Sequence, residues 1–384
     1  MNLRFDHTHY VPVLRFKRSE KVALQELRTQ ARAGITPLLE IVPTADYAPR
    51  RVADEIRTHW GPYPFFLDLH HLPEAQDGDL MLKMNGALRS HGLPSIPVVG
   101  LSNGRQFQRA VEMVVALDKR GVCIRLFPED IQSKSLQLGI ERLVNTLGLT
   151  PERIDLIADY RLISEFNPSY EDLCRVLPEL NRWRTFTVIS GAFCQDLKDY
   201  DKNAQYERNR DDWLSWRNQV LLPSLPRYPT HGDYTIQYAL LVEPPPFPNT
   251  SASIRYTSDN YWVIMRGEGK RTGPGSSQYA ANAELLCGRP EFCGAAFSPG
   301  DRYIYNLYQR IGRRPGSAET LLRAGISHHV TFVVDQLAKL FGTSTGDEPF
   351  LGYSPNQQPQ QVERTLPRAS YGARFRPHQA RPRD

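Results

Sequence analysis

Long apolar segments are missing from this sequence of 384 residues. A transmembrane helix needs about 20 consecutive apolar residues, and no window of the sequence approaches that length. The opening segment, MNLRFDHTHY, also lacks the apolar core of a secretory signal. We therefore expect a cytoplasmic protein that has no membrane partner.

Cysteine is sparse and shows no paired spacing. The five cysteines are scattered, without a Cys-x-x-Cys pair, and this excludes a disulfide framework and a zinc-finger site. A phosphate-binding loop of the GxxxxGK[ST] type is also missing, because the segment GEGKRTG departs from that pattern. The net charge of +5 is mild, so it permits a phosphate-rich partner without requiring one.

What the sequence does contain is a regular alternation of short apolar runs and helix-like segments. Over most of the region the runs recur about every 25–35 residues, the spacing expected of successive βα units. Eight runs predict a (β/α)8 TIM-like barrel, and a doubly wound open sheet is the alternative. The runs are residues 10–16, 35–42, 63–69, 95–101, 121–127, 153–160, 185–191 and 233–242.

Beyond the eighth run the alternation ends, and this sets the predicted domain boundaries. We assign residues 1–243 to the barrel. Residues 244–342 contain a predicted hairpin, a loop rich in glycine and serine, and helices that we expect to pack on the barrel. Residues 343–384 are rich in proline and arginine, show no apolar periodicity, and are predicted to be disordered.

Charged residues recur near the carboxyl ends of the predicted strands. Because successive side chains of a strand point to opposite faces, Arg15 and Lys17 share the face of Val13. A parallel sheet buried on both faces is normally apolar, whereas a barrel opens at its carboxyl end into a mouth where active sites lie. We therefore expect six charged side chains in that mouth: Arg15, Lys17, Glu40, Asp68, Arg125 and Asp159.

These six side chains carry equal numbers of positive and negative charges, which leaves two interpretations open. A self-satisfied ion network would look the same as a binding site, because buried charges are paired in either case. If the group is a binding site, its equal numbers of positive and negative charges argue against a dedicated divalent-metal site, which would be mainly acidic. We therefore predict no metal ligand and assign no cofactor. The charge balance favours an anionic ligand held by Arg15, Lys17 and Arg125, with Glu40, Asp68 and Asp159 available for acid–base catalysis.

Two flanking features extend the hypothesis of a site. Lys17 lies next to a helix predicted to start around Ser19, and the free N–H groups of that helix would contribute to an anion site. His70 and His71 follow Asp68 at a strand end, and they are weaker candidates than Asp68 itself. The mouth is therefore the region in which we expect ligand binding.

Several longer segments resemble, in the same order, segments of the beta protein family of phages and bacteria. They are HYVPVLRFKRSEKVALQEL, ITPLLEIVP, HGDYTIQY, SIRYTSDNYWVIMRG, FCGAAFSPGDRYI and AGISHHVTFVV, and the resemblance covers roughly residues 9–340. The resemblance implies an organisation and candidate positions rather than a chemistry. The additional ligand-binding positions that it implies are Asp233, Tyr234, Arg266, Asp301, His328 and His329.

Two functions are compatible with the sequence. In the first, the barrel is an enzyme, expected to be a hydrolase, that handles an anionic ligand such as a phosphorylated or nucleotide-like molecule. In the second, the chain is a non-catalytic binding subunit that recognises nucleic acid or a partner protein. The occurrence of the resembled family in phages implies, for this second function, a phage-defence or phage–host-conflict assembly. A ligand site near Lys17 and Asp68 would favour the enzyme, and direct charge pairing without a cavity would favour the subunit.

Overall fold

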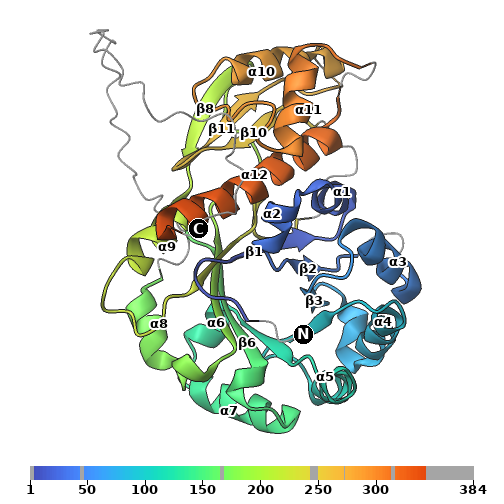
Figure 1. Cartoon of the computed structure of the whole chain (residues 1–384), viewed down its shortest axis with the longest axis vertical. Coiled ribbons are helices and arrows are strands. Elements are labelled where there is room, and N and C mark those ends of the chain that lie inside the picture. The colour runs from blue at the N-terminus through green and yellow to red at the C-terminus, as the bar shows by residue number, and fades with distance from the viewer. Residues whose placement is uncertain are drawn as a thin grey trace, which may run out of the picture. The chain divides into compact units, whose positions relative to one another are not determined.

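The structure, a computed structural model, describes residues 4–43, 47–164, 168–242, 250–271, 273–312 and 316–342. Its parallel strands close into a barrel in the order β1-β2-β3-β4-β5-β6-β7-β9 (Figure 1). The predicted eight-stranded barrel is therefore confirmed, and the open sheet is excluded. The barrel strands are β1 (Tyr10–Arg15), β2 (Leu38–Glu40), β3 (Phe65–Asp68), β4 (Ser95–Val99), β5 (Val122–Leu126), β6 (Ile154–Leu162), β7 (Thr185–Gly191) and β9 (Thr230–Asp233).

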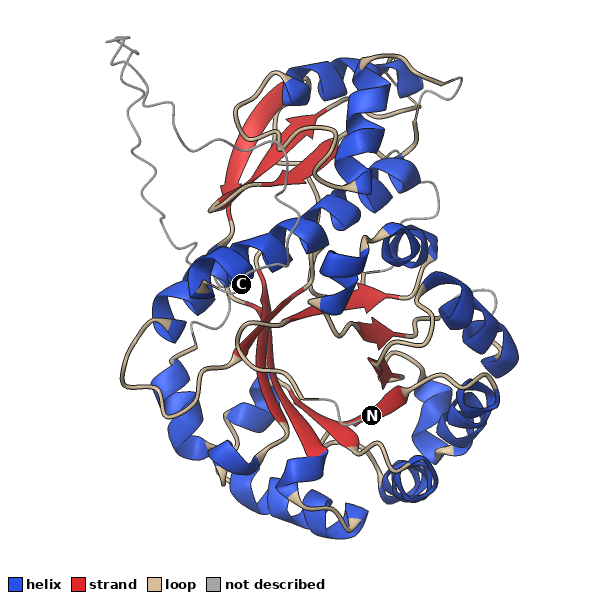
Figure 2. Cartoon of the chain, in the orientation of Figure 1, coloured by secondary structure: helices blue, strands red, loops and turns tan. Residues whose placement is uncertain are grey.

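Helices surround the ring of strands, as Figure 2 shows in blue. They cover the outer face of the sheet, which is the arrangement that buries both faces of a parallel sheet. The α-helices are α1 (Arg18–Glu26), α2 (Thr29–Ala33), α3 (Pro49–His59), α4 (Asp79–Ser90), α5 (Arg105–Asp118), α6 (Pro128–Ile131), α7 (Leu136–Leu147), α8 (Tyr170–Val176) and α9 (Asp211–Val220). Short 3₁₀ helices occur at η1 (Pro73–Asp77), η2 (Pro151–Arg153) and η3 (Leu180–Arg182).

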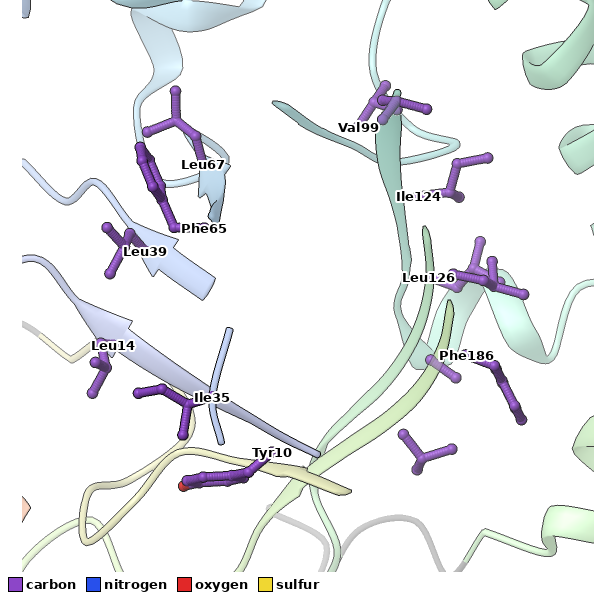
Figure 3. Packing of buried hydrophobic residues seen from close by; sticks show 14 of the residues in the cluster. Tyr10, Leu14, Ile35, Leu39, Phe65, Leu67, Val99, Ile124, Leu126 and Phe186 are labelled. Carbon is purple, nitrogen blue, oxygen red and sulfur yellow. The ribbon is translucent and has the colours of Figure 1, made fainter. Parts of the chain in front are cut away.

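Strand alternation divides the barrel residues into an outer and an inner apolar cluster. Side chains such as Leu14, Leu39 and Ile124 lie on the outer face of the ring, where they join the cluster formed with the helices (Figure 3). Val13 and Leu38 belong to the inner cluster, which fills the barrel interior. Polar residues follow on the same inner face at the carboxyl ends of the strands. The strand register places Arg15 next to Glu40, and Glu40 next to Asp68.

The eighth barrel strand differs from the predicted run at residues 233–242. It is β9, which starts at Thr230 and ends at Asp233. The strand stops because Thr235 has a φ of +58°, a left-handed conformation that a strand does not contain. Asp233 Oδ1 accepts the backbone N–H of Thr235 at 2.8 Å and stabilises this turn. The apolar side chain of Ile236 is buried in the outer cluster without belonging to a barrel strand.

A second, antiparallel sheet has the strand order β10-β11-β8. Its outer strands come from different parts of the chain, because β8 (Ala204–Asn209) precedes β9 and β10 (Ile254–Thr257) follows it. The boundary predicted at residue 243 therefore does not separate the two sheets. The remaining elements of this region are β11 (Tyr261–Arg266), η4 (Gly275–Ser277), α10 (Gln278–Cys287), α11 (Pro299–Tyr308) and α12 (Ala318–Phe341).

Helix α12 packs against both sheets. At Gly325 the helix lies so close to its neighbours that a Cβ atom would be 2.5 Å from Ile236 Cδ1 and 2.8 Å from the backbone oxygen of Arg255. Ile236 follows barrel strand β9, whereas Arg255 lies in β10 of the second sheet. The absence of a side chain at Gly325 thus allows one helix to contact both.

Among the described residues, no helix has the length and apolar character needed to cross a membrane. The disorder predicted for residues 343–384 concerns a segment that lies outside the described residues.

We expect Gly325→Ala to lower the free energy of unfolding by about 1–3 kcal/mol, because the added methyl group overpacks a backbone contact. Gly86→Ala is the matched control, since Gly86 also lies in a helix but a Cβ atom there meets nothing within 4 Å. The control should gain about 0.5–1 kcal/mol from the better helix propensity of alanine. Urea unfolding monitored by circular dichroism measures both, and equal effects of the two substitutions would contradict the close packing of α12.

Candidate functional site

A buried arginine occupies the carboxyl-end mouth of the barrel. Arg125, on β5, donates from Nη1 to Glu40 Oε1 at 2.9 Å and to Asp68 Oδ2 at 2.6 Å. Its Nε and Nη2 both donate to Asp159 Oδ2. Nη2 also donates to the hydroxyl oxygen of Tyr234, which in turn donates to Asp159 at 2.7 Å. All five N–H groups of the guanidinium are thus used.

We call this group the mouth cluster: Arg15, Glu40, Asp68, Arg125, Asp159 and Tyr234. Arg15 is its second cation, and its Nε lies 3.9 Å from Glu40 Oε2. The Nη2 of Arg15 donates to the backbone oxygens of Tyr238 and Ala239, both at 2.8 Å. Three carboxylates against two guanidinium groups leave the cluster with one negative charge. The structure therefore brings together most of the charges that the strand pattern assigned to the mouth.

Two imidazoles follow β3 and approach Glu40. His71 Nε2 lies within hydrogen-bond distance, 3.2 Å, of Glu40 Oε2. His70 Nε2 lies 4.0 Å from Glu40 Oε1, and its Nδ1 lies 3.1 Å from Asp68 Oδ1 without hydrogen-bond geometry. The two ring centroids are 3.7 Å apart. Donor atoms of Glu40, His70 and His71 all lie within 4.8 Å of one another, which is close enough for a shared metal ion.

Electrostatics keep the two neighbouring carboxyl groups ionised. Burial raises the pKa of Glu40, but Arg125 and the two imidazoles outweigh it and lower that pKa to about 2. Burial likewise raises the pKa of Asp68, yet His70 and Arg125 lower it far below its ordinary range. Burial raises the pKa of the Tyr234 hydroxyl, which keeps its proton. At neutral pH the cluster therefore presents fixed negative charges rather than proton donors.

A pocket of about 190 Å³ lies beside the mouth cluster, and Asp68, His70 and Arg125 form part of its wall. Another part is Arg161, whose guanidinium carbon lies 4.1 Å from the ring centroid of Phe127. Arg161 has a φ of +54°, at the point where β6 loses its regular register. Left-handed backbone is unfavourable for a long side chain, and it persists where the surrounding structure enforces it, often at functional sites.

The sequence did not predict Arg161 and Phe127 as parts of the pocket wall, and it also missed the turn after β4. Residues 100–104, GLSNG, connect β4 with α5 and have the G-x-S-x-G spacing of a nucleophile elbow. Among the described residues, those with left-handed φ do not include Ser102, so the strained elbow geometry is not present. Ser102 is instead an exposed hydroxyl in the pocket wall, next to the start of α5. The position of this turn directly after a predicted strand could have indicated that it lies at the mouth of the barrel.

Lys17 and Arg266 lie apart from the mouth cluster. Strand β1 ends at Arg15 and α1 begins at Arg18, so the alternation stops before Lys17, which is exposed at the N-cap of α1. The helix thus starts one residue earlier than predicted. Arg266 ends β11 in the second sheet, where its Nη1 donates to the backbone oxygen of Gly267.

Asp233 points to the outside of the barrel and forms a second buried cluster. It accepts a short hydrogen bond of 2.5 Å from the hydroxyl of Tyr10. His329 Nε2 on α12 lies 3.0 Å from Asp233 Oδ2, and His231 Nε2 lies 3.2 Å from the same oxygen. All four side chains are almost fully buried. This cluster joins α12 to the barrel and is not part of the pocket wall.

Asp301 and His328 form a third cluster, inside the region of the second sheet. His328 Nδ1 lies 2.9 Å from Asp301 Oδ2, and its Nε2 lies 2.8 Å from the backbone oxygen of Thr257. Tyr256 and Ser298 donate their hydroxyls to the two oxygens of Asp301. Both nitrogens of His328 therefore have a polar partner, and the cluster is fully buried.

Comparison with known protein families shows the family to which the chain belongs. The Beta protein family matches residues 10–335, which is more than half of the sequence. The chain belongs to the Beta protein family. A search of curated proteins finds no match.

The segments that carry the Beta protein resemblance have two different structural roles. Tyr234 reaches the mouth cluster, whereas Asp233, Asp301, His328 and His329 lie in the two enclosed clusters around α12. The Beta protein pattern therefore includes the connection between the barrel and the second sheet as well as the mouth.

Replacing Arg125 with methionine should lower the free energy of unfolding by about 3–5 kcal/mol, because three buried carboxylates lose their cation. Arg57→Met is the matched control, since Arg57 is exposed and pairs with Asp54 one turn away. A surface pair of this kind is worth less than about 1 kcal/mol. Urea unfolding measures the loss of stability in the Arg125→Met and Arg57→Met variants.

Adding Asp159→Asn to the Arg125→Met variant should restore part of the stability, since it removes one unpaired charge. Equal stability of the Arg125→Met and Arg57→Met variants would show that the mouth cluster does not depend on Arg125.

Stability should also depend on pH through Asp212, a buried residue in the first turn of α9. Burial, and then repulsion from Asp233, raise the pKa of Asp212 from 3.8 to about 7. Between these values the folded chain binds more protons than the unfolded chain, so the contribution of this group to stability falls as pH rises. Asp212→Asn removes the titration, and its Oδ1 can still accept the Trp213 N–H.

The melting temperature of Asp212→Asn, relative to wild type, should therefore rise between pH 5 and pH 8. Asp211→Asn, next to it but exposed, should show a constant difference over the same range. Calorimetry at both pH values tests this, and a constant difference for Asp212→Asn would refute it.

Proposed function

We propose that the mouth pocket binds a small anionic ligand, a phosphorylated or nucleotide-like molecule, and that the chain acts on it as a hydrolase. The observation that carries the proposal is the strained Arg161, whose guanidinium lies over Phe127 in the pocket wall. Guanidinium groups bind phosphate through paired hydrogen bonds, and left-handed backbone at a non-glycine residue is found at functional sites as well as at turns such as that of Thr235.

Arg161 can exchange its present partner for a ligand. Its Nη2 lies 3.2 Å from Glu129 Oε1, and the two side chains are 33% and 62% exposed. A pair this exposed contributes little to stability, because water and salt screen the charges. A phosphate group in the pocket would offer Arg161 a better partner at small cost.

The start of α5 supplies a second element of the anion site. A helix begins with N–H groups that have no partner within the helix, and the N-cap Gly104 has no side chain to cap them. Ser102 offers a hydroxyl donor just before this point. Donors of both kinds favour an anion at the pocket wall.

The size of the pocket limits the ligand. Pockets for complete drug-sized ligands measure about 300–1,000 Å³, whereas this one measures about 190 Å³. We therefore expect it to enclose a phosphoryl group with a small substituent, while any larger part of the ligand extends into solvent.

Hydrolysis requires a group that activates water, and the predicted acids and bases suit that role poorly. Glu40 and Asp68 have lowered pKa values and are held by Arg125, so they are weak bases and are not proton donors at neutral pH. Their role in the proposed function is electrostatic.

A second function is favoured by the direct pairing of Arg125 with three carboxylates, since a satisfied network needs no ligand. In that case the chain would be a non-catalytic subunit of a phage-defence or phage–host-conflict assembly that recognises nucleic acid or a partner protein. The mouth cluster would then only stabilise the barrel. Binding of short oligonucleotides with a steep salt dependence, but no binding of phosphate, would support this function.

Titration calorimetry with inorganic phosphate tests the pocket directly. Arg161→Ala should weaken phosphate binding about tenfold or more, because a charge-assisted hydrogen bond is worth about 1.5–3 kcal/mol. Arg175→Ala is the matched control, since Arg175 is exposed and pairs with an acidic residue one turn away. Hydrolysis of p-nitrophenyl phosphate by the same variants tests the reaction class. Unchanged phosphate binding in Arg161→Ala would overturn the assignment of the pocket.

A further inference from the structure

Three donor atoms of suitable chemistry meet at the edge of the mouth cluster. His71 Nε2 lies 3.2 Å from one oxygen of Glu40, and His70 Nε2 lies 4.0 Å from the other. Ligand bonds to a zinc ion are about 2.0–2.2 Å long, so two donors on one ion lie roughly 3–3.5 Å apart. The first distance already fits. Because Oε1 is held by Arg125, the ion would take Oε2, and the donor atoms of the three residues lie within 4.8 Å of one another, so the ring of His70 must move inward by about 1–2 Å.

We propose that Glu40, His70 and His71 bind one divalent transition-metal ion, with Zn²⁺ as the expected ion. Two imidazole nitrogens and one carboxylate oxygen form a ligand set used by catalytic zinc and by other divalent transition metals, whereas Ca²⁺ and Mg²⁺ prefer oxygen ligands only. The sequence had argued against a metal by setting Lys17 and two arginines against three acids. In the folded chain Lys17 lies elsewhere and the two imidazoles join Glu40.

The surrounding residues orient the three ligands. Arg125 donates to Glu40 Oε1, which leaves Oε2 directed at His71. Asp68 Oδ1 accepts the backbone N–H of His70 at 2.9 Å and lies 3.1 Å from its Nδ1. A proton on Nδ1 would leave the lone pair of His70 on Nε2, the nitrogen that faces Glu40. Nδ1 has no hydrogen bond in this structure, and a rotation of the ring toward Asp68 would complete the carboxylate–histidine pairing that is common behind metal ligands.

The charge around the ligands favours a cation. The mouth cluster has a net negative charge when the imidazoles are neutral, and a divalent ion would make it positive. The two ring centroids lie 3.7 Å apart, so both imidazoles can offer a nitrogen to the same ion.

The site is open on one side. His70 and His71 are partly exposed, with 29% and 17% of their side-chain surface accessible, and His70 lines the pocket. Three protein ligands with an open position are typical of catalytic rather than structural metal ions. The metal site stands on its own geometry. In the proposed function, the ion would activate water next to a bound phosphoryl group, a role for which Glu40 and Asp68 are poorly suited. This role rests on the proposed function.

Metal binding is tested by titrating chelator-treated full-length protein with Zn²⁺ in a phosphate-free buffer, using calorimetry. We expect one equivalent to bind. His71→Ala and His70→Ala should each weaken binding by about a hundredfold, since even an outer partner of a metal ligand is worth about 10–100-fold. His91→Ala is the matched control, because His91 is also partly exposed and also lies 3.0 Å from a carboxylate, that of Asp54.

Chemical modification provides a test without substitutions. Diethyl pyrocarbonate should modify His70 and His71 in the chelator-treated wild type, and one equivalent of Zn²⁺ should protect both while leaving His91 reactive. Absence of saturable Zn²⁺ binding, equal binding by all three variants, or equal protection of His91 would overturn the proposal. Phosphate titration of the same metal-free protein separates the metal site from the proposed phosphate pocket. Phosphate binding without Zn²⁺ binding rejects only the metal site, and Zn²⁺ binding without phosphate binding rejects only the proposed function.

Discussion

The interior of this barrel depends on one guanidinium group. Strands β2, β3 and β6 each bring a carboxylate to the same level of the mouth, and three such charges cannot remain ionised there without a cation. Arg125 meets all three and Tyr234 with its five N–H groups. A lysine has only three donors in a tetrahedral arrangement and could not do the same. The orientation of Glu40, and with it the environment of the two imidazoles, follows from this single residue.

The link between the barrel and the second sheet depends on two consecutive histidines. Successive residues of a helix point about 100° apart, so neighbours on α12 can reach different partners. His329 turns to Asp233 of the barrel, while His328 turns to Asp301. Thr257 contacts both, since its carbonyl faces His328 and its hydroxyl lies 2.8 Å from His329 Nδ1. Buried polar pairs of this kind add specificity of docking to the apolar packing around Gly325.

Strand periodicity was sufficient to predict the barrel and the inward direction of Glu40, Asp68, Arg125 and Asp159, because side chains alternate strictly for as long as a strand continues. The same rule failed at strand ends. Lys17 lies past the last residue of β1, and the eighth strand stops at a left-handed Thr235 that no composition rule reveals. The direction of Asp233 depends on a register that only the folded sheet defines. The enclosed positions of His328 and His329 depend on tertiary contacts of the same kind.

The position of β8 between β7 and β9 has a consequence for synthesis of the chain. This strand leaves the ribosome before β9 can close the barrel and before its own partner β11 exists. At about 5–20 residues per second, the wait for the end of β11 lasts on the order of 3 to 10 seconds. During that time β8 is a free edge of the kind that promotes aggregation. Its sequence, AQYERN, alternates half-buried and exposed positions and places Gln205, Glu207 and Asn209 on the exposed face. Because this face is polar, β8 exposes little apolar surface before β11 is made, which disfavours aggregation with a second nascent chain.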